Sequence, residues 1–341
     1  MFKYTEQIAY HALALGTQSS YSQLKKLWNQ FDSWQKAWEL TSHRYKIDPQ
    51  KEFKKLEQQG VRLTLRNDSD FPKLLREIPL APFGLYVKGK ISDLPQVAII
   101  GTRRATMLGK KVARDFSKKL AQSGVGIVSG LALGVDAEAH RGALESGGAT
   151  IAVLARGLGY IYPSIHNNLA EEIITSGGAL ISEYPPGTSA LPYRFLERNR
   201  IVSGLSRGVL VVECPERSGV VATTRFAVEQ NREVWVIPGS IRDKNYTGSH
   251  KLIKEGAALV TEPLEILDML GIKPLETKIE LKALAPNEER LLNILREAGR
   301  PLSVDKISIE ANLDTRTVSR TITYLIMKEI ITETPRGFIT H

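Results

Sequence analysis

Two arginine clusters, about 95 residues apart, carry the most distinctive chemistry of this sequence. The first is the glycine turn Gly101-Thr102-Arg103-Arg104, whose backbone N–H groups, hydroxyl and two guanidiniums near a helix start are typical phosphate ligands. The second follows a proline-rich loop and contains Arg194, Phe195, Arg198, Asn199 and Arg200. Because arginines bind phosphates and an aromatic ring stacks on a base, this combination favours a single-stranded nucleic acid as ligand.

Both clusters also have structural explanations. The arginines of the turn can simply be solvated, Phe195 can pack beneath the loop, and the later arginines can pair with Glu183 or Glu197. However, the turn and the loop each follow an apolar run, and open α/β sheets bind ligands outside the carboxyl ends of their strands. We therefore expect the second cluster to lie beside the turn at Gly101.

Several short motifs resemble cofactor or catalytic sites but have the wrong spacing or context. No glycine follows Gly101 until Gly109, so the GxGxxG fingerprint of nicotinamide cofactors is missing. Residues 84–90 read GLYVKGK, but Ile91 stands where a phosphate-binding loop needs Ser or Thr. Residues 204–208 match GxSxG, yet the apolar strand follows this motif instead of preceding it. We therefore expect no cofactor and no serine-hydrolase site.

Asp136 and His140 stand four residues apart, on one face of a predicted helix. A metal ion would need a third ligand, and the sequence offers no candidate nearby. A local hydrogen bond or helix cap is the interpretation favoured here, so no metal site is predicted.

The composition is that of an ordinary globular protein of 341 residues, with 42% hydrophobic and 24% charged residues. Its single cysteine, Cys214, excludes an internal disulfide framework and fits a reducing compartment. The N-terminus has no signal-peptide pattern and no apolar run reaches 18 residues, so we expect a cytoplasmic protein without a membrane span. The net charge of +9 lies in the first 283 residues, because residues 284–341 carry eight basic and eight acidic side chains. A polyanionic partner is therefore favoured for the middle of the chain and not for the tail.

Apolar runs alternate with helical patterns through the middle of the chain. The expected strands are 97–100, 125–128, 150–154, 179–182, 208–213, 233–237 and 258–260. The expected helices between them are 110–123, 135–147, 166–177, 194–204, 222–231 and 249–255. This order predicts βαβ units with right-handed crossovers. The predicted fold class is α/β, a Rossmann-like parallel sheet with helices on both faces.

Two smaller regions flank this sheet. Residues 1–70 show helical spacing and hold three of the four tryptophans, which predicts a small helical domain with its own core. The Rossmann-like domain is assigned to residues 71–270, of which 71–96 are a proline-rich connecting segment. A linker is expected at 271–283.

Residues 284–341 predict three helices and two short strands, the plan of a winged-helix-like domain. The expected helices are 287–298, 304–311 and 314–328, and the expected strands are 330–333 and 337–340. In such a domain the third helix would face a major groove with Arg316, Ser319, Arg320 and Thr323.

Eight short motifs between residues 97 and 260 resemble, in order, those of the DNA processing protein A family (DprA, also called Smf). They are IIGTRRAT…G, SGLALGVDAEAH, YP…N, SEYPPGT, FLERNRI, GLS, VVE…SG and PG…G…LI..GA. The resemblance implies a cytoplasmic protein, not an enzyme, that binds incoming single-stranded DNA during natural transformation, protects it and loads the RecA recombinase. It also implies a homodimer formed through the Rossmann-like domains.

The same resemblance implies roles for particular residues. The single-strand pocket would use Arg103, with Thr102 in place of the family's serine, together with Arg194 and Phe195, and with Arg198, Asn199 and Arg200 beside them. Leu196 departs from the family, which usually has proline there, and this puts the stiffness of the loop in question. The dimer and RecA surface would include His250, Lys254 and Leu259.

Two other functions remain open on the sequence. Related Rossmann-like phosphoribohydrolases cleave nucleoside monophosphates with a PGGxGT..E signature, whereas residues 215–223 of this chain lack the double glycine. A winged-helix transcription regulator with an α/β sensor domain would instead prefer duplex DNA through residues 284–341. The sequence leaves open the ligand of the tail, the affinity of the dimer and whether the host is transformable.

Overall fold

The computed structural model describes residues 4–273, 285–328, 330–334 and 337–340. Residue contacts divide the chain into two compact units, residues 1–276 and 277–341. Most of the linker expected at 271–283 lies outside the described residues. The first unit holds both the expected helical region and the α/β region.

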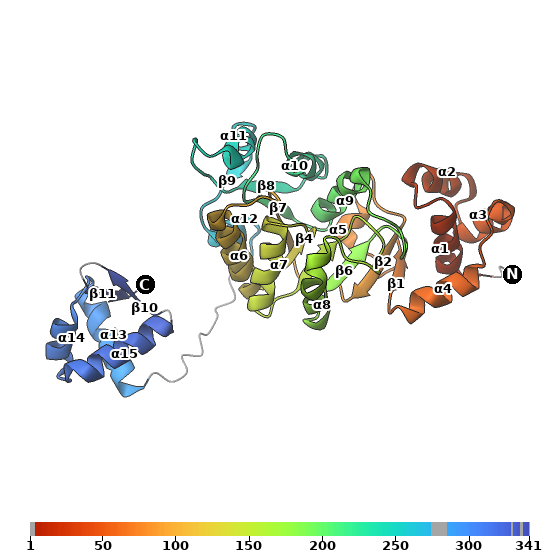
Figure 1. Ribbon diagram of the computed structural model, residues 1–341. Coiled ribbons are helices and arrows are strands. Elements are labelled where there is room, and N and C mark those ends of the chain that lie inside the picture. The colour runs from red at the N-terminus through yellow and green to blue at the C-terminus, as the bar shows by residue number, and fades with distance from the viewer. Residues whose placement is uncertain (1–3, 274–284, 329, 335–336, 341) are drawn as a thin grey trace. The chain divides into compact units, whose positions relative to one another are not determined.

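A nine-stranded sheet forms the centre of the first unit (Figure 1). Its order is β1-β2-β6-β5-β4-β3-β7-β8-β9, and the seven strands from β6 to β9 are all parallel. These seven are β3 (Gln96–Ile100), β4 (Gly126–Ser129), β5 (Thr150–Val153), β6 (Ala179–Ser182), β7 (Gly208–Val211), β8 (Glu233–Val236) and β9 (Ala258–Leu259). The predicted Rossmann-like parallel sheet is thus confirmed, with every expected strand in place.

The parallel strands are continuous apolar runs because helices cover both faces of the sheet. On one face, side chains of β3 and β7 pack with α6 (Met107–Gln122), α7 (Val135–Glu145) and α12 (Pro263–Met269). On the other face they pack with α5 (Lys73–Arg76), α9 (Pro192–Gly204), α10 (Gly219–Glu229) and α11 (Thr247–Lys254). Figure 1 shows α6 and α7 side by side, and both cover the same face of the sheet.

The N-terminal residues form α1 (Glu6–Gly16), α2 (Tyr21–Phe31), α3 (Trp34–Thr41) and α4 (Pro49–Gln58). Trp34 and Trp38 are buried among them, which confirms that these rings are core. This core is continuous with the side chains of α8 (Asn167–Thr175) and of the edge of the sheet. The expectation of a separate core for this region is therefore wrong: its helices pack onto the α/β region within one compact unit.

The expectation of helices throughout residues 1–70 is wrong at its end. Residues Arg62–Leu65 form β1, which pairs antiparallel with β2 (Gly84–Gly89), and β2 pairs antiparallel with β6. The four-residue strand gains its stability from this non-local pairing and from burying Leu63 and Leu65. Neither is visible in a short window of sequence. The proline-rich segment thus contributes β2, which together with β1 extends one edge of the sheet.

The second unit contains α13 (Pro286–Ala298), α14 (Val304–Ala311) and α15 (Thr315–Met327), with β10 (Ile331–Thr334) and β11 (Gly337–Thr340) as an antiparallel pair. Its core is separate from that of the first unit and includes Leu291, Leu295, Ile307 and Leu325. Asp314 caps α15 by accepting a hydrogen bond from the Thr317 N–H. Three helices and a hairpin are thus present as expected. No helix among the described residues of the chain has the length and hydropathy needed to cross a bilayer.

Candidate functional site

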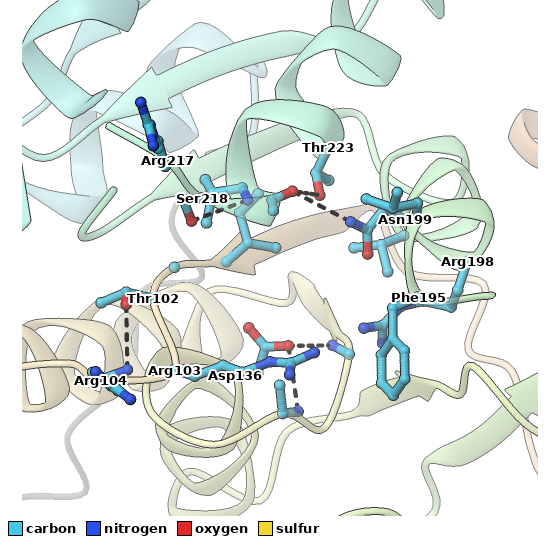
Figure 2. Close-up of a pocket in the computed structure, with 18 of the residues that line it drawn as sticks. Thr102, Arg103, Arg104, Asp136, Phe195, Arg198, Asn199, Arg217, Ser218 and Thr223 are labelled. Carbon is cyan, nitrogen blue, oxygen red and sulfur yellow. Dashed lines mark hydrogen bonds between the residues drawn. The ribbon is translucent and has the colours of Figure 1, made fainter. Parts of the chain in front are cut away.

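A cavity of about 420 Å³ opens at the carboxyl ends of β3 and β7 (Figure 2). The chain runs from β3 outward to β6 and then returns to place β7 on the other side of β3. Such a reversal of strand order leaves a crevice between the diverging loops. The cavity is lined by the turn after β3, the loop after β4, the start of α9 and the start of α10.

The turn after β3 presents its two arginines to solvent at the cavity. Gly101 permits the close approach of α7, because a Cβ there would collide with the side chain of Val135. The Thr102 N–H donates to the Glu213 carbonyl at 2.9 Å, and the Thr102 hydroxyl accepts from the Arg104 N–H at 3.2 Å. These contacts fix the backbone while the side chains of Arg103 and Arg104 remain exposed.

The far end of this turn is held by the buried carboxylate of Glu213. It accepts hydrogen bonds from the Thr106 N–H at 3.1 Å, the Thr106 hydroxyl at 2.5 Å and the Asn245 amide at 2.9 Å. Thr106 is in turn the N-cap of α6. Glu213 thus positions the whole segment between β3 and α6.

The first turns of α9 face the cavity with Phe195, Arg198 and Asn199, a spacing of three and four residues that places them on one side of the helix. The Arg103 guanidinium carbon lies 5.1 Å from the centroid of the Phe195 ring, within the range of a cation–π contact. The expectation that the two clusters adjoin is therefore met by the structure. A flat apolar ring and several guanidiniums share one opening (Figure 2).

The floor of the cavity contains a buried guanidinium and a buried carboxyl. Arg198 donates to the Val153 carbonyl at 2.5 Å, and Asp136 accepts from the N–H groups of Gly130 and Ala132 at 3.1 and 3.4 Å. Burial raises the pKa of Asp136, and the nearby Arg198 charge opposes that rise. A Cβ at Gly130 would overlap the Arg198 guanidinium, so a side chain there would have to displace it.

Two of the predicted site residues do not line this cavity. Arg194 is buried, donates to the Ser189 carbonyl at 2.5 Å and lies 4.9 Å from the Tyr184 ring. Arg200 is buried in an ion pair with Glu183. Arg200 stands on the side of the helix away from Phe195, and Arg194 is turned by about 100° from that ring. Both are expected in the pocket only because they belong to the same motif as Phe195.

The residues expected at the dimer and RecA surface lie on α11 and β9. The His250 ring nitrogen Nε2 is 3.0 Å from the Gly239 carbonyl, and Lys254 is exposed. Leu259 is half exposed on β9, which pairs with β8 and with no other strand among the described residues. These assignments remain predictions.

Asp136 and His140 do not share a ligand. Asp136 binds backbone N–H groups, as noted, and the His140 ring nitrogen Nδ1 lies 2.7 Å from the Thr150 hydroxyl. Local hydrogen bonding, the interpretation favoured from the sequence, is confirmed for both. In the part of the chain that the structure describes, no group of three or more His, Cys, Asp or Glu side chains is arranged to hold a metal ion.

Sequence reasoning missed several residues at the cavity. Arg217, Ser218 and Thr223 line it from the loop after β7 and from α10. The signal was available, because this loop also follows the carboxyl end of a parallel strand. Tyr162 was missed as well: its ring stands edge-on to Phe195, with centroids 5.8 Å apart.

Comparison with known proteins bears on this arrangement. The family model described as DNA recombination-mediator protein A matches residues 62–271. Protein Smf of Escherichia coli is 39% identical over 295 residues, which cover 83% of this chain and 78% of that protein.

Two solved structures are also similar. DNA processing protein A from Streptococcus pneumoniae has a TM-score of 0.63 and 35% identity, covering 78% of this chain and 93% of that one. The DNA processing protein A from Helicobacter pylori, described for its single-stranded DNA binding mode, has a TM-score of 0.56 and 30% identity, covering 62% of this chain and 95% of that one.

Proposed function

This chain belongs to the DNA recombination-mediator protein A family, and on that premise we propose that it binds single-stranded DNA in the cavity between β3, α9 and α10. The observation that carries the proposal is the contact of Arg103 with the Phe195 ring at the cavity mouth. A base can stack on a ring while a guanidinium beside it binds the adjoining phosphate. The relative from Helicobacter pylori, described as binding single-stranded DNA, supports the same ligand.

The shape of the site favours a single strand over a duplex. Phe195 is only partly exposed and lies within a cavity, so a base must leave its stack to reach the ring. Arg103, Arg104 and Arg217 come from two different loops around the opening, which suits a backbone that passes through it. Contacts of this kind read phosphates and base faces and are therefore tolerant of sequence.

The proposal extends to the role of the bound strand. As a family member this chain would protect incoming DNA during transformation in the cytoplasm and load RecA on it. It would act as a homodimer through the surface that carries His250, Lys254 and Leu259. This is a binding function, and no chemical step is assigned to the cavity residues.

A gel shift that compares an oligo-dT single strand with a duplex of the same length, each at two salt concentrations, tests the proposal. We expect tighter binding of the single strand, weakened strongly by salt because phosphate contacts release counterions. A preference for duplex that disappears when residues 277–341 are removed would instead favour a winged-helix regulator. Release of a free base from a nucleoside monophosphate by the pure protein would favour a phosphoribohydrolase.

A further inference from the structure

The loop between β5 and the short 3₁₀ turn Ser164–His166 carries two exposed tyrosines, one of which touches Phe195 of the cavity. Tyr162 is 51% exposed and its ring meets Phe195 edge-on, whereas Tyr160 is 68% exposed. The Arg156 guanidinium carbon lies 5.5 Å from the centroid of the Tyr160 ring. The loop thus repeats the combination found at the cavity mouth, an aromatic ring with an arginine beside it.

This loop is held in place by the core of the first unit. Leu158, just before the two exposed tyrosines, is buried in the core, and Ile161, between them, is partly buried against it. The Gly157 N–H donates to the Thr188 carbonyl at 3.0 Å, and a Cβ on Gly157 would collide with the backbone of Pro185. The tyrosine rings are therefore presented by an anchored backbone, which lowers the entropy that a ligand must overcome in ordering them.

A large aromatic side chain contributes strongly to the free energy of binding when a ligand buries it. We propose that Tyr162 and Tyr160 form a second stacking platform, on which bases next to the one held at Phe195 are bound. The proposal rests on the proposed function, since it extends the same strand beyond the cavity. Arg103 lies beside the Phe195 ring and Arg156 lies beside the Tyr160 ring. These two positive charges favour a nucleic-acid strand over an apolar peptide as the ligand.

Length-dependent binding tests the platform. Fluorescence anisotropy with the full chain and a series of oligo-dT lengths would compare wild type with Tyr160→Ala/Tyr162→Ala and Tyr160→Phe/Tyr162→Phe. Removing the rings should weaken binding of the longer oligomers at least about fivefold, which corresponds to the lower end of the free energy of one base–aromatic stack. The shortest oligomer that binds should lose less affinity. The phenylalanine pair keeps the rings and should bind like wild type.

Three outcomes would count against the platform or its premise. If the alanine pair binds long oligomers like wild type while Phe195→Ala loses affinity, the platform is wrong and the proposed function stands. Equal losses at every length would also contradict it, because the rings would then only support Phe195. If wild type binds no single strand at any length, the proposed function itself fails.

Photocrosslinking gives a direct readout of the same contact. An oligo-dT with one 5-iodouracil placed at successive positions should crosslink to the peptide that carries Phe195 from one position and to the peptide that carries Tyr160 and Tyr162 from neighbouring positions. Crosslinks confined to the Phe195 peptide at all positions would overturn the platform.

Discussion

Arg103 and Phe195 separate two physical contributions to one binding site. The guanidinium is exposed and supplies charge, whereas the ring is partly buried and supplies a stacking face. Their contact places both at the mouth of a single cavity, so each can be removed without removing the other. The predicted changes in affinity are therefore distinguishable.

Replacing Phe195 by alanine should weaken binding of oligo-dT by roughly 1–3 kcal/mol, the range for the loss of one base–aromatic stack. Isothermal titration or anisotropy measures this directly. Arg207→Ala is a matched control for Arg103→Ala, because Arg207 is also exposed but stands at the amino end of β7, whereas the cavity lies at the carboxyl end. A loss of affinity in the control as large as in Arg103→Ala would argue against a localised site.

The substitution Glu213→Gln tests whether Glu213 holds the turn after β3 in place. Glutamine keeps the shape of the side chain but replaces one acceptor oxygen by an NH₂ group, which is itself a donor. That group would face other donors, the Thr106 N–H and the Asn245 amide. A buried donor left without a partner costs about 1–3 kcal/mol, so we expect the free energy of unfolding to fall by that amount and single-strand affinity to fall with it. Urea unfolding of the variant checks the first effect. Unchanged stability would mean that Glu213 does not hold the turn.

His140 should make the stability of the first unit depend on pH. Burial lowers the pKa of His140 to about 3. Because the unfolded chain takes up this proton near pH 6.5 and the folded chain does not, stability is retained above that pH and lost as the pH falls toward 3. Between pH 7 and 5 the titration of His140 should lower the free energy of unfolding by about 2 kcal/mol.

Urea unfolding at both pH values, followed by tryptophan fluorescence, measures this effect, since all four tryptophans lie in the first unit. His140→Asn removes the titration and should show a smaller loss on acidification, whatever its stability at pH 7. An equal loss in wild type and variant would contradict the assignment.

At the scale of the element, α9 divides its arginines between two tasks. Arg198 lies at the cavity, whereas Arg200 is buried against Glu183. The sequence predicts both in the pocket, because the motif reads Arg-Asn-Arg and a resemblance transfers motifs as wholes. Which side of the helix each arginine occupies depends on the register of α9 against the sheet, and that register is set by packing that no short window of sequence displays.

Arg200→Ala should therefore destabilise the fold without removing the binding site. Leaving the Glu183 carboxylate buried and unpaired costs about 3–5 kcal/mol. The fraction that folds should bind oligo-dT like wild type, and Arg200→Lys should recover part of the stability. Thermal unfolding with a parallel binding assay measures both. If the variant is as stable as wild type but no longer binds oligo-dT, Arg200 belongs to the binding site after all.

The parallel strands illustrate which elements can be predicted. β3 and β7 are buried on both faces, and such strands are uninterrupted runs of Val, Ile and Leu that stand out in the sequence. β1 is four residues long and owes its existence to pairing with β2, so it was assigned to the helical region. The turn glycines were recognised, but the contact of Tyr162 with Phe195 joins the loop after β5 to α9 and required the folded structure.

At the scale of the whole molecule, the cavity is contained within the first unit. All its lining residues lie between Ile100 and Thr223, and the second unit has a separate core. The second unit also carries ten basic and nine acidic side chains, a net charge of only +1, so it adds little long-range attraction to a polyanion. Its exposed Arg316 and Arg320 on α15 leave a local contact with nucleic acid as a prediction.

Removing residues 277–341 should therefore leave single-strand binding within about twofold of the full chain. The truncated protein should still unfold cooperatively, since its core loses no side chain. Anisotropy titrations of both forms with the same oligo-dT make the comparison. A large loss of affinity on truncation would show that the second unit contributes to the site.

The salt dependence of oligo-dT binding by wild type, Arg103→Ala and Phe195→Ala tests the central claim most directly. For wild type we predict a logarithm of affinity that falls linearly with the logarithm of salt concentration, by about 0.7 per phosphate contact. Arg103→Ala should reduce that slope by about 0.7, because one phosphate contact is lost. Phe195→Ala should lower the affinity at every salt concentration and leave the slope unchanged. The same affinity and the same slope in all three proteins would contradict the claim that this cavity binds single-stranded DNA.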